Sequence, residues 1–501
     1  MENKLNRVIE IDKPRRILLS IGNLLGWDLE TQLPEKGSDF RSEQVALLSS
    51  LAHEKLTGKP LEEALEPFIE FETEAIKVSS LSEKEKASLK LWVKDIKRAR
   101  KLPQEFVEQT AKTTSRAFTG WAEAKTKNDF SIYAPHLKSI VDNCRKKAEY
   151  YGYTDHPYDA LVDEFEPEMT KAKLSEIFDN LKPFLKDKIQ AIRSEEPDAP
   201  FVNKEYSKEK QLAFAHSLLE KMGIDFTTAR LDQAEHPFCL TVHTTDLRMT
   251  THSDLSHFFN NISAVMHEGG HGLYEQGLPH DEFGTPLCDS ISLGIHESQS
   301  RFWECVIGLS KPFSTFLHKE LTTIFPKELS GTSQEEMYAQ LTKVNPGFIR
   351  IFSDEVCYCL HVILRFEIEV ALLEGKMEVE EIPGIWNQKM EEYLGITPTS
   401  DAVGCLQDVH WSHGIMGYFP TYALGNIYAG QLFQTFRQEN PSWETDVASG
   451  KLVFIRDWLK EKIHKYGRQY SPQEMIEKAT GKPISSDDYI NYLNEKYPQK
   501  R

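Results

Sequence analysis

Apolar side chains recur at three- and four-residue intervals along most of the chain, with charged residues between them. This spacing predicts amphipathic α-helices rather than strands. The clearest such segments are residues 103–151, 171–192, 207–222 and 333–341. Expected boundaries are marked by prolines at positions 34, 157, 167, 346 and 383. The pattern therefore predicts a mainly α-helical protein.

One stretch departs from the helical pattern. Residues 236–243 and 247–251 are rich in β-branched and aromatic side chains, and a Thr-Thr-Asp run between them suits a turn. We therefore expect a short β-hairpin here. After it, Ser253 or Asp254 is suited to cap a helix that begins near Leu255.

That helix carries a pattern typical of a metal site. His267 and His271 are four residues apart, so both imidazoles lie on one helical face and can bind one ion. Glu268 projects beside them, where a carboxylate can take a proton from a water molecule that zinc activates. The alternative is a solvated helix face with two incidental histidines.

Two adjacent glycines, Gly269 and Gly270, favour the metal site over the solvated face. Each glycine inside a helix costs about 1 kcal/mol relative to alanine, so a pair requires a structural reason. The close approach of another backbone or of a substrate would supply that reason.

A catalytic zinc ion takes three protein ligands and keeps one position open. We expect the third ligand to be Glu297, in a second helix that packs against the first. That helix has an apolar face made of Leu293, Ile295, Phe302, Val306 and Leu309. The residues alone leave other acids open as the ligand, namely Glu275, Asp281, Glu282 and Asp289.

Composition and charge narrow the classes of function. The content of 40% hydrophobic and 27% charged residues is typical of a globular protein, and no run of about 18 apolar residues predicts a membrane span. A net charge of −18 disfavours nucleic acid as a partner. Residues 1–7 do not resemble a signal peptide, so we expect the cytoplasm. The seven cysteines are expected to be free, buried thiols.

Six ordered motifs resemble those of the carboxypeptidase Taq-type zinc carboxypeptidases. They are His-Pro-Phe at 236–238, Asp-x-Arg-x-Thr at 246–250, His-Glu-x-x-His at 267–271, His-Glu-Ser-Gln at 296–299, Ile-Arg-x-x-Ser-Asp at 349–354 and Gly-x-x-Gln-Asp-x-His-Trp at 404–411. The fifth has Ser353 where the family usually has alanine. Residues 27–31 and 158–161 also resemble family segments.

The resemblance spans nearly the whole chain. It implies one mainly α-helical catalytic unit over residues 1–501, with a deep substrate groove and the small hairpin beside the zinc helix. It also implies a homodimer, and it favours Glu297 as the third zinc ligand over the other acids.

A carboxypeptidase must bind the free carboxylate at the end of its substrate, and arginine binds a carboxylate through two parallel hydrogen bonds. Arg350, in the fifth motif, is the first candidate. The alternative is that Arg350 only forms an ion pair with Asp354 and braces a helix. Arg248 is the second candidate, although Asp246 in the same hairpin can occupy it.

The oxyanion that develops during peptide hydrolysis requires hydrogen-bond donors. The candidates are His410, Tyr418, Tyr422 and His236. The alternative is that the aromatic side chains are part of the core and that His236 only holds the hairpin. Trp411 is expected to pack rather than to take part in chemistry.

Together these residues predict a zinc-dependent carboxypeptidase that releases amino acids from peptide C-termini with broad specificity. Zinc would be held by His267, His271 and Glu297, a ligand set that also suits cobalt, with Glu268 as general base. The alternatives are an endo- or oligopeptidase that uses the same chemistry and a peptide-binding protein with structural zinc. The second is disfavoured because structural zinc prefers cysteine-rich ligand sets.

Overall fold

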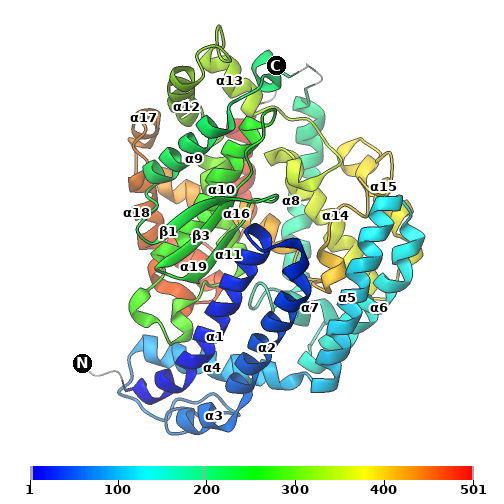
Figure 1. The fold of residues 1–501 in the computed structure, drawn as a ribbon, viewed down its shortest axis with the longest axis vertical. Helices are drawn as coiled ribbons and strands as arrows, with labels where there is room; N and C mark the ends of the chain where they lie inside the picture. Colours follow the sequence, from blue (N-terminus) through cyan, green and yellow to red (C-terminus); the bar gives the residue numbers. More distant parts are fainter. Residues whose placement is uncertain (1–3, 195, 197, 499–501) are drawn as a thin grey trace.

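Helices form most of the regular structure, as the apolar spacing predicts (Figure 1). The computed structural model describes residues 4–194, 196 and 198–498. Its α-helices are α1 (Asn6–Thr31), α2 (Ser38–Thr57), α3 (Lys59–Leu65), α4 (Glu83–Lys101), α5 (Gln104–Lys127), α6 (Phe130–Tyr151), α7 (Pro157–Val162), α8 (Lys171–Ile192), α9 (Lys208–Met222), α10 (Phe258–Gly277), α11 (Leu293–Arg301), α12 (Lys311–Ile324), α13 (Gln334–Leu341), α14 (Glu355–Leu373), α15 (Ile382–Leu394), α16 (Pro420–Glu439), α17 (Trp443–Ala448), α18 (Val453–Lys462), α19 (Pro472–Thr480) and α20 (Asp487–Lys496).

Shorter helical turns connect several of these helices. Those of 3₁₀ geometry are η1 (Glu35–Gly37), η2 (Pro200–Asn203), η3 (His280–Glu282), η4 (Pro286–Cys288), η6 (Arg350–Phe352), η7 (Val379–Glu381), η8 (His410–His413) and η9 (His464–Gln469). The segment η5 (Phe302–Ile307) has π geometry and continues α11 directly.

The predicted helical segments are confirmed, with one division. Residues 171–192 are α8, and the segments at 207–222 and 333–341 are α9 and α13, which each begin one residue later. The segment at 103–151 is two helices, α5 and α6. The chain turns between them because Asn128 adopts a left-handed conformation, with φ of 53°, and the Asp129 side chain caps α6.

The predicted hairpin is also confirmed, but it belongs to a larger sheet than expected. Strands β2 (Cys239–His243) and β3 (Asp246–Thr251) pair antiparallel, while β1 (Ala229–Gln233) pairs parallel with β3 on its other edge. The sequence analysis did not predict β1, because this five-residue strand has only two apolar side chains, Ala229 and Leu231, between charged and polar ones. Helix α10 packs against this sheet (Figure 1).

The helix that carries His267 and His271 begins later than predicted. It was expected to begin near Leu255, with Ser253 or Asp254 as the cap, but α10 begins at Phe258. The Asp254 carboxylate instead accepts the N–H of Ser256 at 2.7 Å, which closes a turn before the helix. Local hydrogen bonding therefore competes with helix capping at this site.

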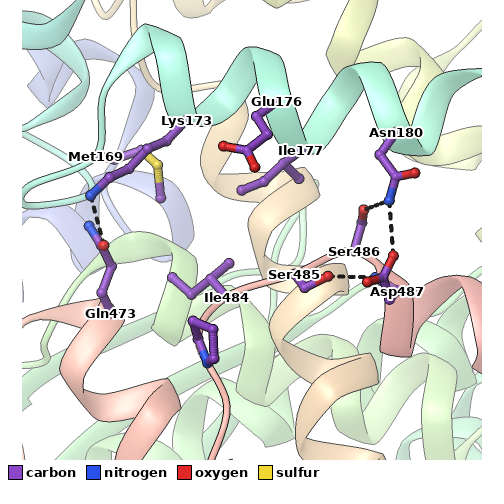
Figure 2. A pocket seen from close by; sticks show the side chains of 11 residues that line it. Met169, Lys173, Glu176, Ile177, Asn180, Gln473, Ile484, Ser485, Ser486 and Asp487 are labelled. Atoms are coloured by element: carbon purple, nitrogen blue, oxygen red, sulfur yellow. Dashed lines mark hydrogen bonds between the residues drawn. The ribbon is translucent and has the colours of Figure 1, made fainter.

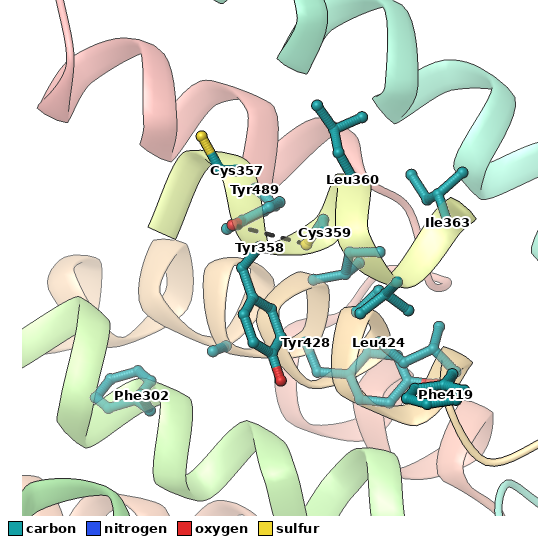
Figure 3. Close-up of a cluster of buried hydrophobic side chains, with 14 of the residues drawn as sticks. Phe302, Cys357, Tyr358, Cys359, Leu360, Ile363, Phe419, Leu424, Tyr428 and Tyr489 are labelled. Atoms are coloured by element: carbon teal, nitrogen blue, oxygen red, sulfur yellow. Dashed lines mark hydrogen bonds between the residues drawn. The ribbon is translucent and has the colours of Figure 1, made fainter. Parts of the chain in front are cut away.

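The largest hydrophobic core surrounds α14, whose side chains are apolar on nearly every face. Figure 3 shows Leu360 and Ile363 of α14 above Leu424 and Tyr428 of α16, all fully buried. Helix α20 closes this core from the other side through Tyr489.

A smaller core lies between the N-terminal helices α1, α3 and α4, around Val8, Leu65 and Trp92. The structure does not test whether this part moves as one unit with the rest, so a single unit over residues 1–501 stays a prediction.

Helices α10, α11 and α16 approach one another through glycines. A Cβ atom at Gly270 of α10 would lie 2.6 Å from the Ser300 Cα atom of α11, and one at Gly425 of α16 would lie 2.3 Å from the Glu297 Cγ atom. A Cβ atom at Gly269 would lie 2.5 Å from Leu219 of α9. The predicted close approach of another backbone is therefore confirmed at Gly270.

The described cysteines and helices fit two further expectations. All seven cysteines are free thiols, and six of them are buried. Within the described part of the chain, no helix combines the length and the apolar character needed to cross a membrane.

Replacement of Gly270 by alanine should separate α10 from α11, because the new methyl group would meet the backbone of Ser300 rather than a flexible side chain. We expect a loss of about 1–3 kcal/mol in the free energy of unfolding, measured by thermal denaturation. Gly22→Ala, inside α1 with no atom within 4 Å of the added carbon, is the matched control and should be neutral or stabilising. Equal stability of the two variants would contradict the close contact.

Candidate metal centre and carboxylate site

Three predicted metal ligands converge between α10 and α11. The Nε2 atoms of His267 and His271 lie 3.2 Å apart, and each lies 3.7 Å from Oε2 of Glu297. Ligand atoms at about 2.0–2.1 Å from a tetrahedral zinc ion would lie about 3.3 Å from one another. Two imidazoles and one carboxylate at these separations therefore fit a single divalent ion and leave one position open.

Three of the other acids that the sequence left open have different partners, and the fourth, Asp281, is exposed in η3. Glu275 binds His296, Glu282 pairs with Lys84 at 3.0 Å and Asp289 pairs with Arg16 at 2.9 Å. Among the described residues, the cluster able to hold an ion consists of His267, His271 and Glu297.

His267 is oriented by a carboxylate that the sequence analysis did not identify. Its Nδ1 atom lies 2.8 Å from Oε2 of Glu304, which also accepts hydrogen bonds from Ser263 and Arg301, each at 2.7 Å. Burial raises the pKa of Glu304, but Arg301 and His267 outweigh it and hold the pKa below its ordinary value. An ionised Glu304 therefore fixes the ring with Nε2 toward the metal position. Glu304 lies seven residues after Glu297, about two helical turns further along the chain, and this spacing is a signal in the sequence that could have identified it.

His271 is oriented by a chain of two side chains. Its Nδ1 atom lies 2.5 Å from Nδ1 of His296, whose Nε2 lies 2.8 Å from Oε1 of Glu275. With the proton on Nδ1, His271 donates to His296, and His296 donates to Glu275. This arrangement leaves Nε2 of His271 unprotonated and able to bind a metal.

Glu268 lies beside the metal ligands and is only 9% exposed. Burial raises its pKa to about 7, and the charges of Glu297 and Glu304 add to that rise, while His267 opposes it. The carboxyl group is thus held near the ligands without being part of the converging cluster.

Arg350 is buried at the start of η6, and its guanidinium is held by two partners. Its Nη2 atom donates to Asp408 at 2.9 Å, and its Nη1 atom donates to the Tyr358 hydroxyl at 2.8 Å. The alternative ion pair with Asp354 is wrong, because the Asp354 carboxylate caps α14 by accepting backbone N–H groups at 3.0 Å. Arg350 and Asp354 lie on either side of a break between two helical elements, so the i, i+4 geometry does not arise.

Asp408 is shared with a second arginine. Arg365 of α14 donates from Nε to Asp408 at 2.7 Å and, like Arg350, is almost fully buried. Burial raises the pKa of Asp408, but the two guanidinium groups outweigh it and keep the pKa below its ordinary value. Two cations therefore face one anion, and this buried group carries an uncompensated positive charge.

Three of the four predicted oxyanion donors, His410, Tyr418 and Tyr422, lie together around Arg350. The Arg350 guanidinium lies over the Tyr422 ring at 4.6 Å, and the Tyr422 hydroxyl lies 3.2 Å from Nε2 of His410. The Tyr418 ring lies 5.4 Å from that of Tyr422. Burial lowers the pKa of His410 to about 3, with Arg350 acting in the same direction, so its ring is neutral.

The remaining two predicted residues lie on the sheet side. Arg248 donates from Nε and Nη2 to Asp246 at 2.6 and 3.0 Å, and its guanidinium lies over the Trp27 ring. His236 is exposed on the bend before β2. Neither is among the residues that surround Arg350.

Two side chains connect the metal centre with Arg350. Arg301 donates to Glu304 and lies over the ring of Tyr358 at 4.7 Å, and the Tyr358 hydroxyl accepts from Arg350. Burial raises the pKa of Glu297, and the charge of Arg350 is close enough to oppose that rise in part. The two parts of the site are thus held in one buried network.

A separate cavity lies away from these residues. It has a volume of about 380 Å³ between α8 and the loop before α20, and its lining includes Lys173, Asn180 and Asp487 (Figure 2). None of the predicted site residues lines it, and we assign no chemistry to it.

Two histidines and one glutamate that converge, with a buried carboxylate beside them and an arginine nearby, are typical of a metallopeptidase. Within this class, the chain matches the family described as Carboxypeptidase Taq (M32) metallopeptidase over residues 7–497, and it belongs to that family. The resemblance seen in the ordered motifs is therefore confirmed.

Known relatives cover nearly the full chain. Carboxypeptidase 1 of Bacillus subtilis is 37% identical over 476 residues, which are 95% of this chain and 94% of that relative. The solved structure of Pyrococcus furiosus carboxypeptidase has a TM-score of 0.94 at 35% identity and covers 99% of both chains. The M32 carboxypeptidase of Deinococcus radiodurans has a TM-score of 0.94 at 32% identity and covers 98% of both chains. The protein is a metallocarboxypeptidase, a hydrolase that acts on peptides with a divalent metal.

Replacement of Glu304 by glutamine should weaken metal binding, because the amide no longer fixes the His267 ring as a charged acceptor. We expect about a 10- to 100-fold loss of metal affinity, measured by competition with a chromophoric chelator. Glu336→Gln, at an exposed position in the first turn of α13, is the control and should bind metal like the unmodified protein. Unchanged affinity in Glu304→Gln would remove Glu304 from this role.

Proposed function

We propose that this metallocarboxypeptidase uses zinc and releases amino acids one at a time from peptide C-termini, with Glu268 as general base and broad side-chain preference. The observation that carries the proposal is the pairing of two features in one buried network. One is the converging cluster of His267, His271 and Glu297. The other is the uncompensated positive charge at Arg350 and Arg365.

Zinc is supported over other metals by the ligand set. Two imidazoles and one carboxylate, with one position left open, are the usual ligands of a catalytic zinc ion, although cobalt binds the same set. When bound, the metal supplies Lewis-acid activation of water and of the scissile carbonyl. The protein residues then supply proton transfer, orientation of the substrate and hydrogen bonds to the developing charge.

Glu268 is the proposed group for proton transfer. It follows His267 directly in α10, so its carboxyl group projects next to the ligands without joining them. In the proposed mechanism the Glu268 carboxylate accepts the proton of the attacking water and then delivers it to the nitrogen of the leaving amino acid. The reaction passes through no covalent acyl-enzyme.

Arg350 is the proposed partner of the substrate carboxylate. The group formed by Arg350, Arg365 and Asp408 has an excess positive charge, and a buried charge is costly unless an opposite charge compensates it. A terminal carboxylate supplies that charge. Tyr358 and Asp408 hold the Arg350 guanidinium in one orientation before the substrate binds.

The oxyanion donors are proposed among Tyr418, Tyr422 and His410. Burial raises the pKa of Tyr418 and of Tyr422, so both phenols keep their protons at neutral pH. The charges of both Glu297 and Arg350 act on Tyr418, which supports a position between the metal ligands and the carboxylate site. His236 and Arg248 are less well supported, because neither lies near Arg350.

Three further proposals concern specificity, location and partners. Broad specificity rests on the family resemblance, and residence in the cytoplasm is supported by the seven free cysteines. A homodimer that acts on peptides, rather than on nucleic acid or at a membrane, is proposed from the resemblance and the acidic net charge of −18.

Replacement of Glu268 by glutamine should abolish turnover but keep the metal. We expect kcat to fall by about 10²- to 10⁴-fold, with one bound zinc ion per chain by elemental analysis. Glu297→Gln is the matched comparison, since it should lose the metal itself. Near-normal kcat in Glu268→Gln would refute the role as general base.

Substrates with an amidated C-terminus test the carboxylate site. We expect the amides to be cleaved about 10-fold more slowly or worse at equal concentration, because they lack the charge that Arg350 binds. Arg350→Lys should raise KM for free acids by a similar factor, with unchanged zinc content, because lysine cannot form the paired hydrogen bonds. Arg248→Lys is the control. Cleavage of amides as fast as acids would indicate an endo- or oligopeptidase instead, and a rise of KM in Arg248→Lys alone would move the role to Arg248.

A further inference from the structure

The segment from Tyr158 to Glu166, in and after α7, contacts both parts of the site although it supplies neither a metal ligand nor a group for the carboxylate. It precedes α10 by about ninety residues in the chain, as the printed sequence shows. Two fully buried carboxylates lie at its ends. Glu166 is the last residue of the segment, and the hydroxyl of its first residue, Tyr158, donates to Glu369 of α14.

Glu166 holds the beginning of α11. Its Oε2 atom accepts the N–H of Gly294 at 2.9 Å, and its Oε1 atom accepts from the Tyr428 hydroxyl of α16 at 2.9 Å. A Cβ atom at Gly294 would lie 2.5 Å from Oε2 of Glu166, so only glycine allows this contact. The N–H of Leu293 also donates to the Phe165 carbonyl at 3.0 Å.

The helix that Glu166 holds is the one that carries Glu297. Gly294 lies one helical turn before Glu297, so a shift of the helix start along its axis moves the ligand carboxylate. Gly425 of α16 lies against the Glu297 side chain, because a Cβ atom there would lie 2.3 Å from Cγ of Glu297. Glu166 thus holds α11 at its start, while α16 contacts the helix at Glu297.

At the other end, Glu369 holds the segment that carries His410 and Tyr418. Its Oε1 atom accepts from Trp411 Nε1 at 2.8 Å. Its Oε2 atom accepts from the Tyr158 hydroxyl at 2.7 Å and from the N–H of Gly417 at 3.1 Å. Trp411 thus packs, as expected, and also donates a hydrogen bond.

The segment from Tyr158 to Glu166 also contacts directly the part of the site that carries His410 and Tyr418. A Cβ atom at Gly417 would lie 2.8 Å from the N atom of Val162, and the Phe165 ring packs edge-on against that of Tyr418 at 5.2 Å. The backbone between Tyr158 and Glu166 thus contacts the metal-ligand helix and the oxyanion side within a few residues.

We propose that the segment 158–166 is a positioning element, in which Glu166 places the metal ligand Glu297 and the Tyr158–Glu369 pair places His410 and Tyr418. Neither carboxylate touches metal or substrate. The inference rests on the proposed roles of Glu297, His410 and Tyr418, and it explains why a segment far from the metal motif in sequence shares the family pattern.

Hydrogen-bond chemistry separates the two carboxylates. The partners of Glu166 include the Tyr428 hydroxyl, which can accept as well as donate, so a glutamine can direct its amide to Tyr428 and its oxygen to Gly294. Glu369 receives pure N–H donors on both oxygens, from Trp411 and Gly417, so either orientation of a glutamine leaves two donors facing each other. Shortening to aspartate removes the reach of both.

The experiment measures zinc affinity by chelator competition, together with kcat and KM at saturating zinc, in four full-length variants. Glu166→Asp should lose zinc affinity by about 10- to 100-fold with KM unchanged, and Glu166→Gln should stay within about 3-fold of the unmodified protein. Glu369→Asp and Glu369→Gln should each raise KM or lower kcat by about 10-fold with zinc affinity unchanged.

Two results would overturn the proposal. One is normal zinc affinity in Glu166→Asp. The other is an equal loss of zinc affinity in the Glu166 and Glu369 aspartate variants, which would indicate general destabilisation. If an aspartate variant does not fold, Tyr428→Phe and Tyr158→Phe each remove one hydrogen bond, to Glu166 and to Glu369 respectively. The first should then lower zinc affinity, and the second should change KM or kcat. The proposed mechanism gives neither Glu268 nor Arg350 a part in holding zinc, so failure here is distinct from failure of that mechanism, and Glu297→Gln tests the ligand itself.

Discussion

The site depends on how closely α10, α11 and α16 approach one another. Ligand atoms that are to share one ion must lie about 3.3 Å apart, while helices with ordinary side chains at their contact lie 8–10 Å apart, roughly, between axes. Glycines at positions 270 and 425 remove the side chains at the two contacts that matter. As a result, a histidine pair on one helix and a glutamate on the next reach a common point without long, mobile side chains.

Buried charge is the second organising factor. Each candidate metal-ligand histidine is hydrogen-bonded through its other ring nitrogen, His267 directly to the carboxylate of Glu304 and His271 to His296, which in turn binds Glu275. Arg301 then ties the first of these carboxylates to the aromatic ring that supports Arg350. Glu304 and Arg350 are stabilised in a dry interior because each has a partner of opposite charge. The group around Asp408 has two cations for one anion, and it is the proposed binding position of the substrate carboxylate.

Much of this arrangement could be predicted from the sequence, because the periodicity of apolar residues and the spacing of the histidines determine it locally. The helix at 171–192, the hairpin strands and the pairing of His267 with His271 all follow from repeats of two, three or four residues. The start of α10 could not be predicted, since the Asp254 carboxylate closes a turn with Ser256 instead of capping the helix. Strand β1 has only two apolar residues, too few to predict a strand, and it forms by pairing with β3. The roles of Asp408 and Tyr358 became visible only in three dimensions, because their partners are distant in sequence or lie across an irregular turn.

The rigid link between the metal ligands and Arg350 has a consequence for what the protein distinguishes. Arg301 and Tyr358 are packed between the two and fix their separation. Under the proposed roles, a substrate anchored by its terminal carboxylate presents the bond that lies one residue from that anchor, whatever side chain it carries. Each cleavage creates a new carboxylate at the same distance from the next bond. Under these roles the site selects the bond by its backbone distance from the terminal carboxylate. The identity of the amino acid then affects cleavage only through the space available to its side chain.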